Sequence, residues 1–254
     1  MGLGNILAKQ HGLDFGFGFG GAELAALRAE LRELGRIRIC PAIAPAAAEA
    51  LRAELTASTE WVRTLRQGGI ERELDAQTLA TLAPAHLRAV EQLAVQGDDT
   101  VFRFLHDSIR ISPVPAERQA RGWVLDACAE AFNAPATLAL IGELTGEQVR
   151  SFRGDATRYL PGHFLTTHND GRKFGKRVLA LVLNLSQWHI DWGGLMVFHN
   201  AFGAAHCAWT PAFNTLNLFS VPQDHSVTMV TALARAPRLT VSGWFYADAL
   251  PPDG

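Results

Sequence analysis

The segment RYLPGHFLTTHND, residues 158–170, ends with a histidine and an aspartate two positions apart, His168 and Asp170. Side chains at positions i and i+2 of an extended chain point to the same face, so this imidazole and carboxylate can reach one point. His225 opens another β-rich run 55 residues after Asp170, and a neighbouring strand of a closed roll would bring it to the same place. Two imidazoles and one carboxylate suit iron(II) and leave three coordination positions open. We therefore predict that these three residues bind a metal ion.

A His-x-Asp pair is weak evidence by itself, because such pairs also occur on turns, where His168 would be a hydrogen-bonded loop residue. The run HSVTMVTALARAPRLTVSGWFY, residues 225–246, strengthens the prediction because it adds Arg238 and Thr240 on one face of a strand. An arginine fork and a nearby hydroxyl suit the distal carboxylate of a keto acid such as 2-oxoglutarate. The alternatives are that Arg238 is a solvated strand-end residue, or that Arg235 in the preceding turn binds the anion.

Short β-rich runs dominate the chain after about residue 147, which indicates a sandwich or barrel. They are parted by Gly, Pro, Asn and Asp, and they read QVRSFRGDATRYL, RVLALVLNL, GLMVFHN, HCAWTP, FNTLNLF, HSVTMVT and RLTVSGWFY. The run DWGG, residues 191–194, predicts a hairpin turn near the site.

Helical periodicity dominates the first half of the chain. It predicts helices over 22–34, ending at Gly35, and from about residue 46, with others around 75–95 and 122–132. RIRICPAI and TVFRFLHDSIRIS are typical of strands. We expect a flexible arm over 1–20, a helix-rich region over 21–146 and a β core over 147–250. Because no long linker separates them, residues 21–250 are expected to form one integrated α+β domain.

Composition argues against several classes of partner. The net charge is -2, from 23 basic and 25 acidic residues without a block of one sign, so nucleic acid is not implied. The odd number of widely spaced cysteines, Cys40, Cys128 and Cys207, suggests neither a disulfide framework nor a CxxC metal site. With no stretch of membrane-span length, we expect a soluble, cytoplasmic protein with no membrane partner.

Several elements in order, from about residue 158 to 246, resemble the prolyl-4-hydroxylase-like branch of the 2-oxoglutarate and Fe(II)-dependent dioxygenase superfamily. The similar segments are RYLPGHFLTTHND, GKRVLALVLNLSQWHIDWGGLMVFH and RLTVSGWFY. The resemblance implies a double-stranded β-helix, also called a jelly-roll or cupin-like core, covered by helices from the N-terminal half. It also implies hydroxylation of a C–H bond, with a prolyl residue of a protein or peptide favoured as acceptor and succinate and CO2 as co-products.

The resemblance assigns roles to particular residues. His168, Asp170 and His225 would hold Fe(II), while Arg238 and Thr240 would bind the far carboxylate of 2-oxoglutarate. Tyr159 matches a tyrosine that often lines the co-substrate pocket. Relatives often place a tyrosine or threonine where this chain has Leu183 and Asn184, and Asn184 is the residue expected to bind the co-substrate instead. O2 is the second co-substrate, and ascorbate is an optional reductant.

The remaining candidates are interpreted structurally. We expect His163, His189, His199 and His206 to be structural or surface residues, and Trp244 to be a pocket wall because it shares the parity of Arg238. Two other functions stay open: a cupin-like metalloenzyme without 2-oxoglutarate, and a non-catalytic β-roll that binds a ligand or protein. The nature of the acceptor and the presence of a homodimer also stay open, as does a lid role for the FGFGFG segment.

Overall fold

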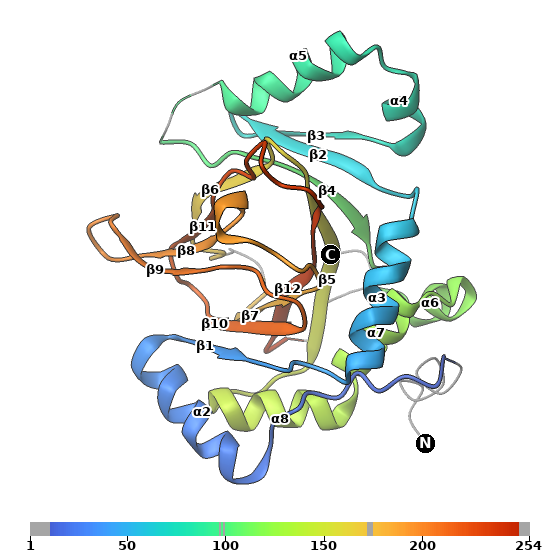
Figure 1. The fold of residues 1–254 in the computed structure, drawn as a ribbon. Coiled ribbons are helices and arrows are strands. Elements are labelled where there is room, and N and C mark those ends of the chain that lie inside the picture. Colours follow the sequence, from blue (N-terminus) through green and yellow to red (C-terminus); the bar gives the residue numbers. More distant parts are fainter. Residues whose placement is uncertain (1–10, 97, 99, 172–174, 249–254) are drawn as a thin grey trace.

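A computed structural model describes residues 11–96, 98, 100–171 and 175–248 of the chain. In these residues one antiparallel sheet of 12 strands curls into a roll (Figure 1). Its order is β1-β10-β7-β12-β5-β4-β6-β11-β8-β9, and β2 and β3 extend it beside β4. The strands are β1 (Arg36–Ile39), β2 (Val62–Gln67), β3 (Ile70–Leu74), β4 (Phe104–Arg110), β5 (Ser151–Tyr159), β6 (Phe164–His168), β7 (Arg177–Asn184), β8 (Met196–His199), β9 (Ala205–Trp209), β10 (Thr215–Ser220), β11 (His225–Val227) and β12 (Arg238–Tyr246).

The two ends of this strand order approach each other, which gives the sheet its rolled form. Arg38 on β1 donates a hydrogen bond to the backbone carbonyl of Thr210, just after β9, and lies 5.7 Å from the centroid of a Trp209 ring. Inside the roll, buried side chains of β7, β8 and β10, including Phe198 and Phe219, form a small core. The observed fold is thus the expected double-stranded β-helix.

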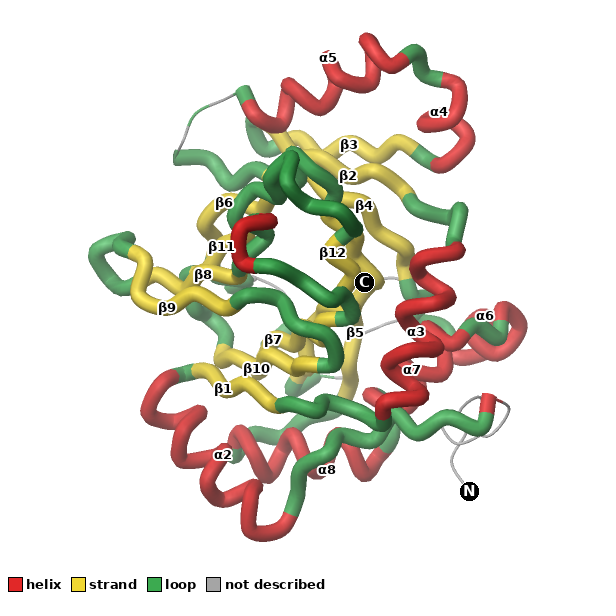
Figure 2. The backbone as a smooth tube through the Cα atoms, viewed as in Figure 1, coloured by secondary structure: helices red, strands yellow, loops and turns green. Residues whose placement is uncertain are grey.

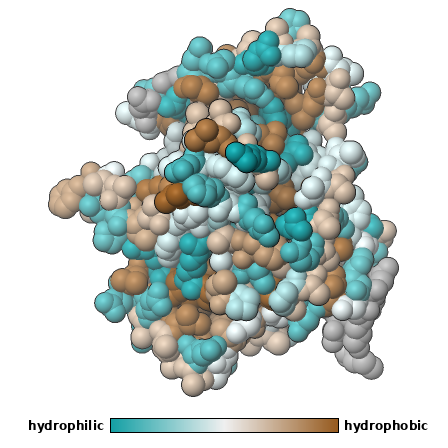
Figure 3. All heavy atoms as spheres, in the orientation of Figure 1, coloured by the Kyte–Doolittle hydropathy of each residue, from teal (hydrophilic) through white to brown (hydrophobic). Residues whose placement is uncertain are grey.

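Helices cover the outside of the sheet (Figures 1 and 2). They are α2 (Gly21–Leu34), α3 (Pro45–Ala57), α4 (Ala76–Thr81), α5 (Pro84–Val95), α6 (Pro115–Arg121), α7 (Val124–Phe132) and α8 (Pro135–Thr145). The main core lies between the sheet and this layer, where the continuous apolar strand β7 is buried along nearly its whole length. Apolar and hydrophilic side chains are interspersed on the face drawn in Figure 3.

Proline and glycine residues explain several helix boundaries. Pro45, Pro84, Pro115 and Pro135 each stand in the first turn of a helix, where a missing N–H costs nothing. Gly35 ends α2 in the left-handed conformation, with a φ of 68°. The helix expected around 75–95 is two helices, because Pro84 starts a new one. The α6 and α8 helices were not predicted.

The N-terminal half contributes more strand than its helical periodicity predicts. Besides β1 and β4, the segment 62–74 forms a hairpin of β2 and β3, joined by Gly68 and Gly69 at positive φ. The strand β4 pairs with both β5 and β6, and so enters the middle of the sheet. Residues 21–146 are therefore part of the roll as well as its cover.

The expected flexible arm falls partly outside the described residues, which begin at residue 11. Its described part is packed: Phe15 and Phe19 are 2% and 7% exposed and belong to the main core. Phe17 packs against Phe132 of α7, with ring centroids 5.1 Å apart. The expectation of a free arm is wrong for residues 11–20, because each of these three phenylalanines has apolar partners.

No single helix among the described residues has the length and apolar character to span a membrane, although α7 and α8, bent by 52°, pass that test as a pair.

Candidate metal and co-substrate site

His168, Asp170 and His225 come together inside the roll. The strands β6 and β11 are antiparallel neighbours with His225 opposite His168, and Asp170 follows two residues after His168. One ligand atom from each side chain lies within 4.8 Å of the other two. The His168 and His225 Nε2 atoms are each 3.5 Å from an oxygen of the Asp170 carboxylate. Strand pairing thus places together residues that the sequence separates.

A hydrogen bond at Nδ1 of each imidazole orients the ring and leaves Nε2 free to bind a metal. His168 Nδ1 lies 3.0 Å from the Thr166 carbonyl oxygen, and His225 Nδ1 lies 2.8 Å from the Gln223 carbonyl oxygen. A carbonyl only accepts, so both Nδ1 atoms carry the proton and both Nε2 atoms present a lone pair toward Asp170. Metal-binding histidines are oriented in this way by an outer partner. The three side chains therefore fit an iron(II) ion.

The protonation states also favour a cation. Burial, with the neighbouring His168, lowers the pKa of His225 to about 4, so its imidazole is neutral near pH 7. Burial alone would raise the pKa of Asp170, but the hydrogen bond from the Trp244 indole acts in the opposite direction, and the pKa of this carboxyl lies below its usual value. An ionised carboxylate beside a neutral imidazole is the state in which both can donate electron pairs to a metal.

Arg238 provides a buried positive charge in the same roll. Its side chain is 2% exposed and lies with its guanidinium carbon 4.8 Å from the centroid of the Tyr159 ring. Its Nε has no hydrogen-bond partner, and among the described residues no carboxylate forms an ion pair with it. Burying a cation without a counter-ion is costly. This arginine is therefore suited to an anionic ligand.

Strand register groups other predicted residues around Arg238. Tyr159 is its direct partner on β5, and Thr240 is the partner of Thr157, with which it shares a hydrogen bond between hydroxyls. Burial raises the pKa of Tyr159, so the phenol stays protonated. The sequence interpretation missed Thr157, although it stands two residues before Tyr159 and so shares its face.

His106 is another residue that the sequence interpretation missed. An aromatic row runs along one face, from Phe102 beside His168 through Phe104 and His106 to Tyr159, with ring centroids 4.6 to 5.6 Å apart. Burial lowers the pKa of His106 to about 4, so it is neutral near pH 7. The alternation of aromatic rings in this strand was the available signal. The row joins the metal end of the roll to the Arg238 end.

The segment 190–194 covers Arg238, and it is not a hairpin. It forms a short 3-10 turn, Ile190–Trp192, and Gly193 bridges to Val230. A Cβ on Gly194, whose φ is +63°, would lie 3.2 Å from Arg238 Cδ. The predicted hairpin is wrong because β7 pairs with β10 and β12 while β8 pairs with β11 and β9, so this segment crosses between two parts of the roll.

Asn184 stands opposite Thr240, as a co-substrate residue would, but its amide donors are in use. Its Nδ2 donates to the Thr215 hydroxyl and carbonyl at 3.1 and 3.3 Å, and its buried Oδ1 has no partner. A free carbonyl oxygen accepts and cannot donate to a carboxylate. In this orientation Asn184 supports the wall through Thr215 and makes no bond toward an anion.

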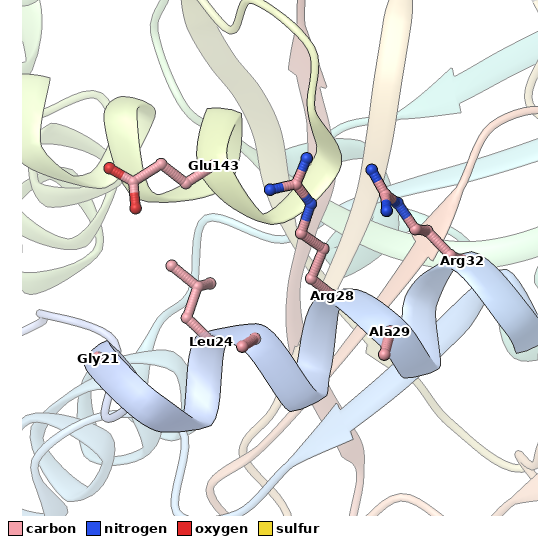
Figure 4. Close-up of a pocket in the computed structure, with 7 residues that line it drawn as sticks. Gly21, Leu24, Arg28, Ala29, Arg32 and Glu143 are labelled. Carbon is pink, nitrogen blue, oxygen red and sulfur yellow. The ribbon is translucent and has the colours of Figure 1, made fainter.

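The other histidines are not part of the triad, which is the one His/Cys/Asp/Glu group of metal-site geometry in the described part of the chain. His163 is 2% exposed, and burial lowers its pKa to about 3. His199 lies 2.9 Å from the Ser226 hydroxyl, and His206 is exposed. A surface pocket between α2 and α8, lined by Arg28, Arg32 and Glu143 among others, contains none of the site residues (Figure 4).

Comparisons with known proteins agree with this geometry. Residues 154–246 match the family described as the 2OG-Fe(II) oxygenase superfamily, a segment that includes the triad, Tyr159 and Arg238. No curated protein sequence gave a significant match to the chain.

Similar folds occur in several solved structures. A prolyl-4-hydroxylase from Pseudomonas putida has 21% identity and a TM-score of 0.50, over 89% of this chain and 100% of that one. A prolyl hydroxylase from Trichoplax adhaerens, in complex with a hypoxia inducible factor peptide fragment, has 13% identity and a TM-score of 0.56, over 89% of each chain. The α-ketoglutarate-dependent epimerase SnoN of nogalamycin biosynthesis has 14% identity and a TM-score of 0.56, over 88% of this chain and 82% of that one.

At these identities the solved structures establish a shared fold, whereas the family match adds the site-bearing segment of the sequence. The match to the 2OG-Fe(II) oxygenase superfamily thus covers residues 154–246, the segment that contains the candidate metal ligands and Arg238.

Proposed function

We propose that this enzyme hydroxylates a C–H bond of a prolyl residue in a protein or peptide, with succinate and CO2 as co-products. The oxygenase part of the proposal rests on one observation: a candidate metal site and a candidate anion site lie inside the same roll. One is the triad, with its two free Nε2 atoms facing a carboxylate. The other is Arg238, a buried cation without an acidic partner among the described residues.

In this proposal His168, Asp170 and His225 hold the iron, and Arg238 with Thr240 holds the far carboxylate of 2-oxoglutarate. Tyr159 packs on the Arg238 guanidinium and keeps it in place. When bound, Fe(II) and 2-oxoglutarate would supply the electrons that activate O2, the oxidant, for attack on a C–H bond. The burial of Arg238 and His225 keeps bulk water from the co-substrate, which strengthens each charge-assisted contact.

A prolyl acceptor is favoured by the surroundings of the triad. The Phe102 ring lies 4.6 Å from His168, and the Trp244 indole donates to Asp170, so aromatic surfaces border the metal position. A pyrrolidine ring is apolar and packs well on aromatic faces. Prolyl hydroxylases are among the structures with this fold, and one of them is in complex with a peptide.

A small-molecule acceptor is the second candidate. The epimerase SnoN shares the fold at a similar TM-score, and a structure of it contains Fe3+, α-ketoglutarate and nogalamycin RO. Because one fold accommodates both kinds of acceptor, the acceptor must be found by experiment.

The test begins with anaerobic protein, to which Fe(II) and 2-oxoglutarate are added while the visible spectrum is recorded. We expect a metal-to-ligand charge-transfer band that is lost in His168→Ala and weakened in Arg238→Ala. Succinate formation is then measured with proline-containing peptides, with the same peptides carrying alanine for proline, and with free amino acids. Product masses that increase by one oxygen atom only in proline-containing peptides would support the prolyl acceptor.

The same measurements separate the two alternative functions. A cupin-like metalloenzyme would bind iron without a charge-transfer band or succinate, and Arg238 would be dispensable. A non-catalytic β-roll would show neither band nor turnover in folded protein. Either outcome would overturn the proposal.

We also propose that the protein is located in the cytoplasm and forms a homodimer. Cys40, Cys128 and Cys207 are all free in the structure, which supports a reducing cytoplasm. Cell fractionation tests the location, and sedimentation of the purified protein tests the homodimer.

A further inference from the structure

Two residues that are not candidate metal ligands contact Asp170. They are Trp244 on β12 and Arg177 on β7. The Trp244 indole Nε1 donates to Asp170 Oδ2 at 2.9 Å. Arg177 Nη1 donates to the Asp170 backbone carbonyl at 3.0 Å and lies 3.4 Å from Oδ1. Each carboxylate oxygen of Asp170 thus has a donor supplied by a different strand.

Arg177 and Trp244 also hold each other. The Arg177 guanidinium carbon lies 3.5 Å from the centroid of a Trp244 ring, so the cation is stacked on the indole. Arg177 Nε donates to the Tyr246 hydroxyl at 3.2 Å. The Arg177 side chain is 10% exposed, which removes much of its rotamer freedom. A buried, stacked guanidinium is a rigid donor rather than a mobile surface charge.

The backbone of Asp170 needs such support. Its φ is +60°, a left-handed conformation that few residues other than glycine adopt, although aspartate and asparagine do so at modest cost. The bond from Arg177 to its carbonyl holds the peptide in this conformation. The same guanidinium therefore contacts both the backbone and the carboxylate of Asp170.

We propose that Trp244 and Arg177 form a clamp that positions the Asp170 carboxylate for metal binding, an inference that rests on the proposed function. A carboxylate oxygen has two lone pairs, and Trp244 uses one pair of Oδ2. The remaining pairs stay directed toward the two imidazoles, whose Nε2 atoms are each 3.5 Å away. Trp244 and Arg177 are positioning residues, and each acts through Asp170.

The clamp predicts a loss of metal affinity that exceeds any loss of fold stability. Outer partners of metal ligands commonly change metal affinity by about 10- to 100-fold. Trp244→Phe keeps a stacking ring and removes only the N–H donor. Arg177→Gln removes the charge, the stacking and the fork, whereas Arg177→Lys retains the charge and should restore part of the affinity.

The experiment is a titration of the metal-free full chain with cobalt(II), followed by visible absorption, together with thermal unfolding of each metal-free variant. We expect the cobalt dissociation constant to rise about 10-fold in Trp244→Phe and further in Arg177→Gln, with Arg177→Lys between Arg177→Gln and wild type. The matched control is Trp188→Phe, which removes an indole N–H that donates to the Gly193 carbonyl at 2.8 Å and should leave cobalt affinity unchanged.

The outcomes distinguish the clamp from the function on which it rests. If the wild-type chain binds no cobalt, the proposed metal site is wrong. If the wild type binds cobalt and a folded Trp244→Phe variant binds it within 2-fold of wild type, the clamp is wrong while the proposed function stands. If Trp188→Phe loses as much affinity as Trp244→Phe, the effect is a general loosening of the roll, which also overturns the clamp.

Discussion

Two buried charged residues, Asp107 and Arg238, lie on opposite faces of the same part of the sheet, and they differ in whether an oppositely charged side chain contacts them. Asp107 on β4 is fully buried, and it accepts hydrogen bonds from Arg63 and Arg158 at 2.7 to 3.3 Å. Arg238, on the other face, is 2% exposed and has no acidic partner among the described residues. The first charge is neutralised within the fold, whereas the second is not. We infer that Asp107 serves stability and that Arg238 serves a ligand.

The pKa shifts express the same contrast. Burial alone would raise the pKa of Asp107, but Arg63 and Arg158 lower it below its ordinary value. Burial lowers the pKa of Arg238, and only Tyr159 counteracts this effect. An arginine remains protonated at neutral pH even so. The uncompensated cost at Arg238 is a reason for the protein to gain stability when an anion binds there.

Neutralising Asp107, the buried charge that has ion-pair partners, should have the largest effect on stability. Asp107→Asn removes the anion and leaves two arginines facing a neutral amide, which we expect to lower the free energy of unfolding by about 3–5 kcal/mol. Denaturant unfolding of metal-free protein measures it. Glu91→Gln is the matched control, because Glu91 pairs with the same Arg63 and its side chain is 26% exposed. A loss below about 1 kcal/mol in Asp107→Asn would contradict the structural role.

Removing the uncompensated charge should affect ligand binding and spare the fold. We expect Arg238→Gln to weaken 2-oxoglutarate binding by about 100-fold or more, since a charge-assisted pair is lost, and to leave unfolding of the metal-free protein within about 1 kcal/mol of wild type. Anaerobic calorimetric titration of manganese-loaded protein measures the affinity. Arg235→Gln is the control, because Arg235 is exposed in the preceding turn. Equal losses in both variants would refute the assignment of Arg238.

Buried neutral histidines predict a stability change with pH. The pKa of His106 is lowered to about 4 and that of His163 to about 3, from 6.5. At pH values between these pKa values and 6.5, the unfolded chain binds more protons than the folded chain. The free energy of unfolding therefore falls as the pH falls from about 6.5 toward 4. The decrease is at most about 1.4 kcal/mol per histidine and pH unit. Burial raises the pKa of Asp155 to about 6, so its contribution is present at low pH, is lost as the pH rises through 6, and opposes the histidines.

Denaturant unfolding of metal-free protein at pH 7 and pH 5 measures this balance. Asp155→Asn removes the opposing group and should steepen the loss at low pH, whereas His163→Gln should reduce it. A wild type that is equally stable at both pH values, together with a flat profile in Asp155→Asn, would show that the histidines are not held neutral.

The smallest expected effect concerns the hydroxyl beside Arg238. Thr240→Val keeps the shape of the side chain and removes the hydroxyl, with its bond to Thr157 and the bond proposed to the co-substrate. We expect this loss to weaken 2-oxoglutarate binding by about 3- to 10-fold, or about 1 kcal/mol. The same calorimetric titration measures it. Unchanged affinity in Thr240→Val would mean that Arg238 holds the carboxylate without Thr240.

Local spacing in the sequence was sufficient for several features. Parity along RLTVSGW places Arg238, Thr240 and Trp244 together, as the strand β12 has them. The HxD spacing predicts that His168 and Asp170 meet, and they do, but Asp170 follows the end of β6 at a φ of +60° and is not on an extended strand. Short β-rich runs predicted the roll, and the helix over 22–34 ends at Gly35 as expected. These properties are local because side-chain direction repeats every two residues in a strand.

Tertiary structure alone decided the rest. The crossing of β7 to β8, the entry of β4 between β5 and β6, and the packing of Phe15 and Phe19 depend on partners distant in sequence. So does the contact of Asp170 with Trp244 and Arg177, which lie on strands that do not contain the ligand. Periodicity specifies which face a residue occupies, but pairing between strands specifies what it meets there, and that choice is made only when the whole sheet closes.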